Sequence, residues 1–228
     1  SYMYSPMTLS EPIQVNLNRG ILKMIHTADL HFGCIDAKTE YNILKEQMID
    51  KLEDMDFDIL SIDGDLYDRK YMTNTDPIQY ASLFVGDLVS LCKRKNATLV
   101  VIAGTKEHDA GQLVIFYHYL NDPEIDIRIV ENIQFEYIKG TKILCIPELY
   151  GVDEEIYQHY LHHSGFYDMC FMHGTIKGAV YGDNVGQSRL FTIEDFSHCN
   201  GPIISGHIHT GGCFNSHFYY TGSPIRWK

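Results

Sequence analysis

The first half of the chain alternates between short apolar runs and longer amphipathic segments. The apolar runs at residues 22–27, 57–63 and 97–103 have the length of β-strands. Between them, apolar residues recur every three or four positions over about 39–54 and 77–95, which is the spacing of amphipathic helices. This order of elements predicts a partly parallel sheet covered by helices.

The second half of the chain contains shorter segments. Residues at about 127–131, 133–139 and 141–147 predict strands in antiparallel pairs, and a helix is expected near 153–163. Three more strands are predicted at about 167–172, 202–205 and 213–220. We therefore expect an α/β fold in which two mixed β-sheets pack face to face with helices outside.

The same pattern indicates how the chain divides. Residues 1–20 are polar with little periodicity, so they predict an N-terminal extension or tail. Residues 21–228 contain no internal repeat and no convincing linker, so they predict one domain. With 45% apolar residues among 228, the chain can bury a full core, and a soluble globular protein is expected.

Composition narrows the classes of function. The chain carries 30 acidic and 18 basic side chains, a formal charge of −12, which argues against non-specific nucleic-acid binding unless bound cations add positive charge. No apolar run reaches the ~20 residues that a membrane span needs, so no membrane association is expected. The six cysteines are scattered without a Cys-x-x-Cys pair, which favours a reducing cytoplasm.

Histidine and aspartate residues gather where the predicted strands end. Asp29 and His31 follow the first strand, and His207 and His209 repeat the same spacing, which in extended backbone points both side chains to one side. Three further candidate ligands also follow predicted strands: Asp65, Glu107 and His173. Oxygen and nitrogen ligands of this kind suit two divalent ions rather than one zinc closed by thiolates.

Five short motifs contain these residues. They are Asp29-x-His31, Gly64-Asp65-x-x-Asp68, the Gly104–Asp109 variant of Gly-Asn-His-Asp, His173-Gly174 and Gly206-His207-x-His209. Their order resembles that of the calcineurin-like metallophosphoesterases. The resemblance covers about residues 22–227 and implies the four-layer αββα fold of that superfamily.

The segment Tyr220–Arg226 resembles the nuclease branch of this superfamily, which contains the bacterial and phage SbcD nucleases and the meiotic-recombination-eleven repair nuclease. Asp68 fits the bacterial form. This resemblance implies a DNA repair and recombination nuclease with endonuclease or exonuclease action, a possible homodimer and an ATPase partner of the SMC-like SbcC type. It also implies that the chain holds the nuclease core without the DNA-capping and ATPase-binding segments.

The resemblance implies a bridging role for Asp65 between two ions. One ion would also be held by Asp29, His31 and His209, and the second by His173 and His207. Manganese is the ion that family members use, with Mg²⁺, Fe or Zn²⁺ as alternatives. Two ions ~3.5–4 Å apart can share one carboxylate and activate a hydroxide between them for in-line attack on phosphorus.

The third motif departs from the family pattern. Aligning it on His108-Asp109 places Glu107 where the family has its ligating Asn, after two inserted residues. A carboxylate ligates a hard metal at least as well as an amide, so Glu107 is a candidate ligand. The alternative is that Glu107 turns away and that Thr105 or water fills the position.

The resemblance also implies three catalytic or supporting residues. His108 would stabilise or protonate the leaving oxygen, and Asp109 would hold the ring of His108. Asp68 would support the turn that carries a metal ligand. The leading hypothesis is a phosphodiester hydrolase acting on DNA. The alternatives are a phosphoesterase of nucleotides or small phosphate esters, and a non-catalytic binding module on the same fold.

Overall fold

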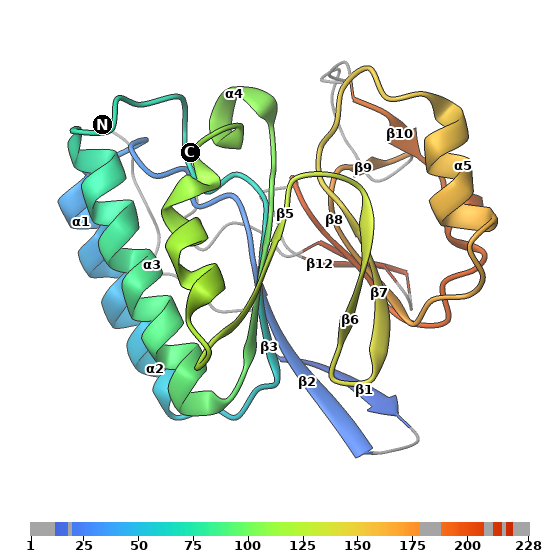
Figure 1. The fold of residues 1–228 in the computed structure, drawn as a ribbon, viewed down its shortest axis with the longest axis horizontal. Helices are drawn as coiled ribbons and strands as arrows, with labels where there is room; N and C mark the ends of the chain where they lie inside the picture. The colour runs from blue at the N-terminus through green and yellow to red at the C-terminus, as the bar shows by residue number, and fades with distance from the viewer. Residues whose placement is uncertain (1–11, 18–19, 178–187, 208–211, 216–217, 221–228) are drawn as a thin grey trace.

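Two mixed β-sheets form the centre of the fold (Figure 1). The computed structural model describes residues 12–17, 20–177, 188–207, 212–215 and 218–220. In the first sheet the strand order is β1 (Ile13–Leu17), β2 (Gly20–Thr27), β3 (Ile59–Asp63), β4 (Thr98–Ile102) and β5 (Asp126–Val130). The strands β2 to β5 are parallel, and β1 pairs antiparallel with β2.

The second sheet has six described strands. Their order is β12 (Gly212–Asn215), β13 (Phe218–Tyr220), β11 (Ile203–Gly206), β8 (Met169–His173), β7 (Thr141–Ile146) and β6 (Gln134–Ile138). The strands β7, β8, β11 and β13 are parallel to one another, and an antiparallel strand flanks them on each side. A separate pair joins β9 (Thr175–Ile176) to β10 (Leu190–Phe191).

Helices cover the outer face of each sheet. The first sheet packs against α1 (Ala37–Leu44), the π-helix η1 (Lys45–Ile49), α2 (Asp50–Glu53), α3 (Asp76–Lys95) and the 3₁₀-helix η2 (Leu113–Asn121). The second sheet packs against α5 (Glu154–His162) and the short 3₁₀-helix η3 (Ile193–Phe196). A single turn of helix, α4 (Lys106–Asp109), follows β4. None of the helices in the described ranges is long and apolar enough to cross a membrane.

Alternation along the strands explains the layers. In β4, Leu99 and Val101 belong to the cluster under the helices, whereas Val100 and Ile102 belong to the cluster between the two sheets. Because both faces of the strand are buried, its sequence is apolar throughout. The second sheet contributes Phe171 and Ile204 to the same inter-sheet cluster. The α/β class, with two mixed sheets face to face and helices outside, is confirmed.

Three local predictions differ from the structure. Residues 13–17 are the edge strand β1 rather than part of a tail, because Ile13, Val15 and Leu17 alternate with polar residues and pack on the inter-sheet cluster. The strand β5 joins β4 in parallel instead of pairing with β6. The segment predicted as one strand at 213–220 contains two antiparallel strands, β12 and β13.

The inter-sheet cluster makes the first testable prediction. Phe171 is fully buried there, with its ring 4.6 Å from the His26 ring. We expect Phe171→Ala to lower the free energy of unfolding by about 3 to 5 kcal/mol, measured by urea denaturation. Tyr137→Ala, on a strand side chain that is 65% exposed, should change it by less than about 0.5 kcal/mol. Equal losses in the two variants would contradict the packing.

Candidate metal centre

Strands from both sheets end at one edge of the molecule and carry the candidate ligands there. The first sheet supplies loops after β2, β3 and β4, and the second sheet supplies loops after β7, β8 and β11. Backbone hydrogen bonds join the first two loops, because Asp29 N donates to Gly64 O (3.0 Å) and His31 N donates to Asp65 O (3.1 Å). The His207 amide donates to Asp29 Oδ2 (3.1 Å), which ties the second sheet to the first.

Three groups of side chains have the ligand types and the closeness that a metal ion requires. They are His31–Asp65–His108, Asp29–Asp65–His173 and Glu148–His173–His207, and within each group the ligand atoms lie within 4.8 Å of one another. Asp65 belongs to two groups and His173 to two, so the three groups form one continuous centre. The structure thus brings together these predicted ligands: Asp29, His31, Asp65, His173 and His207.

Asp65 lies at the middle of this centre. Its Oδ2 is 3.4 Å from His173 Nε2 and 3.8 Å from His31 Nε2, and its Oδ1 is 3.1 Å from His108 Nδ1. Atoms that ligate one cation at 2.0–2.2 Å lie roughly 3.0–3.6 Å apart, so most of these separations fit shared ions. Asp65 Oδ2 therefore lies between histidines of two different groups, His31 and His173, which is the position expected of a bridging carboxylate.

A hydrogen bond to the backbone sets the ring of His173. Its Nδ1 donates to the carbonyl oxygen of Asp63 (2.7 Å), so the Nε2 atom faces the centre. His173 is 1% exposed, and this buried Nε2 has no partner with hydrogen-bond geometry. A metal ion fits such an atom, because a histidine ligand commonly donates its other ring nitrogen to a carbonyl or carboxylate.

The backbone is strained at the candidate ligands. Six non-glycine residues in the described ranges have a positive φ, and four of them are ligand candidates: Asp29 (54°), His31 (50°), Asp65 (54°) and His207 (86°). Such residues seldom adopt this left-handed conformation, and it is concentrated at functional sites. This strain distinguishes the centre from an ordinary set of polar surface residues.

The buried charges shift several pKa values. Burial raises the pKa of Asp29 to about 8, with His173 opposing the shift and Asp65 adding to it. Burial also opposes ionisation of Asp65, but His173 and His108 hold its pKa well below the usual range. Burial disfavours charge on His173, yet Asp65 raises its pKa well above the usual value. Bound cations would compete with protons at these groups, because metal ligands bind in their deprotonated forms.

Asp109 does not hold the ring of His108, so that prediction is wrong. The fully buried carboxylate of Asp109 accepts hydrogen bonds from Gly104 N (2.8 Å) and Tyr67 N (3.2 Å) instead. Consecutive side chains of the helical turn α4 point about 100° apart, so His108 faces Asp65 while Asp109 faces the interior. Asp109 thus joins the loops after β3 and β4.

Asp68 lies near the ring of the candidate ligand His31. Its Oδ1 is 3.7 Å from His31 Nδ1, while the other ring nitrogen of His31 faces Asp65. Its backbone N donates to Phe32 O (3.1 Å), which adds a link between the loops after β2 and β3. The 3.7 Å separation between the Asp68 carboxylate and the His31 ring is longer than a hydrogen bond, so the supporting role of Asp68 stays a prediction.

The third motif differs most from expectation. Glu107 is exposed and belongs to none of the three groups, and Thr105 instead donates its backbone N–H to Asp65 Oδ1 (2.7 Å). Glu148, which is not among the predicted ligands, is buried in the group with His173 and His207. Its signal was a carboxylate directly after the predicted strand at 141–147, the same signal that identified the other ligands.

Two other parts of the prediction fall elsewhere. His209 and the segment 221–226 lie outside the described residues.

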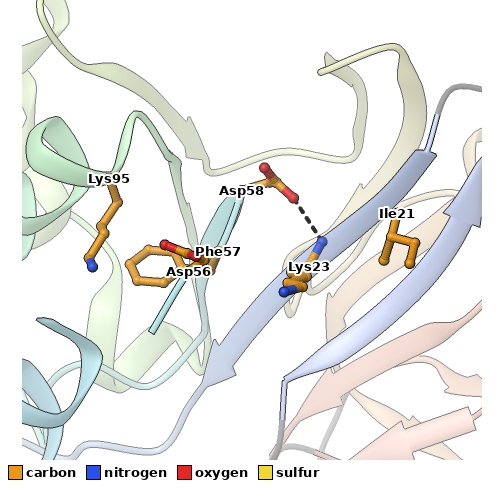
Figure 2. Close-up of a pocket in the computed structure, with 6 residues that line it drawn as sticks. All are labelled: Ile21, Lys23, Asp56, Phe57, Asp58 and Lys95. Atoms are coloured by element: carbon orange, nitrogen blue, oxygen red, sulfur yellow. Dashed lines mark hydrogen bonds between the residues drawn. The ribbon is translucent and has the colours of Figure 1, made fainter. Parts of the chain in front are cut away.

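The cavity of about 350 Å³ in Figure 2 lies at the other end of the strands of the first sheet, where β2 and β3 begin. It is lined by Ile21, Lys23, Asp56, Phe57, Asp58 and Lys95. Its Asp58 accepts a hydrogen bond from the backbone N of Lys23 (2.8 Å). This cavity has no part in the metal centre.

Comparison with known proteins finds a similar fold in another solved structure but indicates no function. No model of a known protein family matches the chain, and no curated protein matches it. Among solved structures, a protein of unknown function from Aquifex aeolicus is 17% identical, with 75% of this chain and 87% of its own covered, at a TM-score of 0.31. Another solved chain is 10% identical, with 96% and 99% covered, at a TM-score of 0.50. The second likeness supports a shared fold and nothing further.

Gly64 provides a test of the close packing around His173. Gly64 has φ +92°, and a Cβ there would lie 2.2 Å from His173 Nδ1, whereas Gly111 has φ +76° and nothing within 4 Å of such an atom. Both alanine variants should lose about 1 to 2 kcal/mol of stability to backbone strain. Gly64→Ala should lose roughly 1 to 3 kcal/mol more through the clash. Urea unfolding in the presence of a chelator measures both; equal losses would contradict the contact.

Proposed function

We propose that the protein is a dinuclear metal-dependent phosphodiester hydrolase of the calcineurin-like metallophosphoesterase superfamily, with the αββα layering of that superfamily. The observation that carries the proposal is the position of Asp65, whose carboxylate lies between His31 and His173 of two different groups of candidate ligands. A single structural ion would need only one such group. Manganese is the proposed ion, as the resemblance implies, and the mixture of carboxylate oxygens and imidazole nitrogens also suits Fe or Zn²⁺.

In this proposal the protein's side chains position the metal ions and act on the leaving group of the substrate. Two divalent ions, when bound, would supply Lewis-acid activation of a phosphate oxygen and of the attacking water. The carboxylates of Asp29 and Asp65 and the ring of His173 would hold the ions at a fixed spacing, since all three are buried. His108, which is partly exposed at the rim, would donate a proton to the leaving oxygen or stabilise its charge.

Within this class we propose DNA as the substrate, as the nuclease resemblance implies. On the same resemblance the chain would act in DNA repair or recombination, with an SMC-like ATPase as partner and a second copy as a possible dimer mate. Ions bound in the centre would supply positive charge locally in a protein whose formal charge is −12. The last turn of α3 carries three basic residues, Lys93, Arg94 and Lys95. They are a poor DNA contact, because Lys93 pairs with Asp122 and Arg94 pairs with Glu53.

The overall negative charge favours a second candidate, a phosphoesterase of nucleotides or small phosphate esters. Such substrates need only the local field of the centre, whereas duplex DNA presents a long line of negative charge to the whole surface. The two candidates share the same ions and the same attack on phosphorus. Only the size and charge of the substrate separate them.

The bridging role of Asp65 makes a prediction about metal content. After reconstitution with Mn²⁺ and dialysis, the parent protein should retain two ions by elemental analysis. Asp65→Asn should weaken both sites together, because it removes the ligand that they share. His108→Asn should keep both ions and lose roughly 10²- to 10⁴-fold in turnover. Unchanged metal content in Asp65→Asn would contradict the bridging assignment, and a parent without metal would favour a non-catalytic module.

The substrate class makes a separate prediction. With Mn²⁺ the protein should cleave labelled DNA and hydrolyse a bis-aryl phosphate, and excess EDTA should abolish both activities. A mono-aryl phosphate, assayed under the same conditions, should turn over more slowly. Intact DNA under conditions where the mono-aryl phosphate is consumed would reject the nuclease and favour the small-ester enzyme.

A further inference from the structure

Glu148 occupies a buried position at the centre. It follows β7 in the second sheet, and its backbone N donates to Ala103 O (3.2 Å), at the end of β4 in the first sheet. The residue is 8% exposed. A carboxylate this well buried is stable only when it is paired or ligates a cation. The groups that contact the Glu148 carboxylate therefore indicate its role.

Two hydroxyl groups fix the orientation of the Glu148 carboxylate. Tyr150 Oη donates to Oε1 (3.0 Å), and Thr105 Oγ1 donates to Oε2 (3.0 Å). Thr105 also donates its backbone N–H to Asp65 Oδ1 (2.7 Å), so one residue of the third motif contacts both acidic groups. The carboxylate is thus held in place before any ligand arrives.

The Oε2 atom of Glu148 faces two histidines. It lies 3.4 Å from His173 Nε2 and 3.8 Å from His207 Nδ1. These separations are close to the roughly 3.0–3.6 Å expected between two ligand atoms on one cation. The His173 Nε2 atom is fully buried and makes no hydrogen bond, so an ion placed between it and Glu148 would satisfy both groups.

We propose that Glu148 is a ligand of the second ion and takes the place that an amide of the third motif holds in the resembled family. This inference rests on the proposed dinuclear function. Glu107, the residue that alignment places there, is exposed and outside the three groups. The second site then consists of Glu148, His173 and His207 together with the shared Asp65.

The exchange of an amide for a carboxylate changes the charge of the centre. Relative to an amide at this position, Glu148 adds one negative charge beside the second ion. The added charge strengthens binding of a hard cation and weakens attraction for an anionic substrate. A phosphate monoester is close to a dianion at neutral pH, whereas a diester is a monoanion. Glu148 therefore favours diesters over monoesters.

The metal-binding test compares three variants, in each of which one glutamate is replaced by an uncharged glutamine. Glu148→Gln should weaken the affinity for the second Mn²⁺ at least tenfold, measured by calorimetric titration of the metal alone, and leave the first site occupied. Glu155→Gln, on an exposed residue of α5, is the matched control and should bind two ions as the parent does. Glu107→Gln distinguishes the two possible ligands, because a loss there with none in Glu148→Gln would overturn the inference.

The selectivity test uses the same variants with synthetic substrates. In Glu148→Gln at saturating Mn²⁺, the ratio of kcat/KM for the bis-aryl phosphate over the mono-aryl phosphate should fall roughly 10- to 100-fold. Glu148→Asp keeps the charge with a shorter reach and should retain most of the parent ratio. Circular dichroism and thermal unfolding of each variant in chelator check that the fold is intact.

The outcomes separate this inference from the function on which it rests. Two ions in the parent and an unchanged second site in folded Glu148→Gln would overturn the role of Glu148 and leave the dinuclear function standing. A parent that binds no Mn²⁺ would overturn both. A weakened second site with an unchanged substrate ratio would overturn the selectivity argument.

Discussion

Asp63 joins the two sheets at the point where the ligands meet. Its carboxylate accepts hydrogen bonds from His26 Nδ1 (2.7 Å) and Ser61 Oγ (2.6 Å), and its carbonyl oxygen accepts one from His173 Nδ1 (2.7 Å). Gly206 packs so closely on this carbonyl that a Cβ there would lie 2.1 Å from the oxygen. The strands β8 and β11 therefore approach β3 most closely around this peptide, which also directs Nε2 of His173 toward the centre.

The backbone strain at the candidate ligands arises where strands of the two sheets come together. Strands of both sheets end at one edge, and each loop must turn sharply to present a side chain inward. Asp29, His31, Asp65 and His207 accept a left-handed backbone for that reason. The inter-sheet cluster and the hydrogen bonds of Asp109 between two loops supply the stabilisation that holds these conformations.

Much of the fold was predictable because its signals are local. Helical spacing over 39–54 and 77–95 reflects helices packed on one face of the first sheet, and apolar runs reflect strands buried on both faces. The edge strand β1 was missed although Ile13, Val15 and Leu17 alternate with polar residues. The partner of β5 was not predictable in this way, since pairing depends on contacts with β4 across many residues of chain.

For the centre, the sequence by itself determined which residue types stand at strand ends, and the carboxyl ends of parallel strands meet at one edge. Asp29, His31, Asp65 and His173 are predicted on this basis, and the structure brings them together. Only the tertiary structure placed Glu148 beside His173 and His207 and left Glu107 exposed. The position of Glu148 involves a contact with Thr105, 43 residues away on a loop of the other sheet, and no local pattern encodes how two sheets face each other.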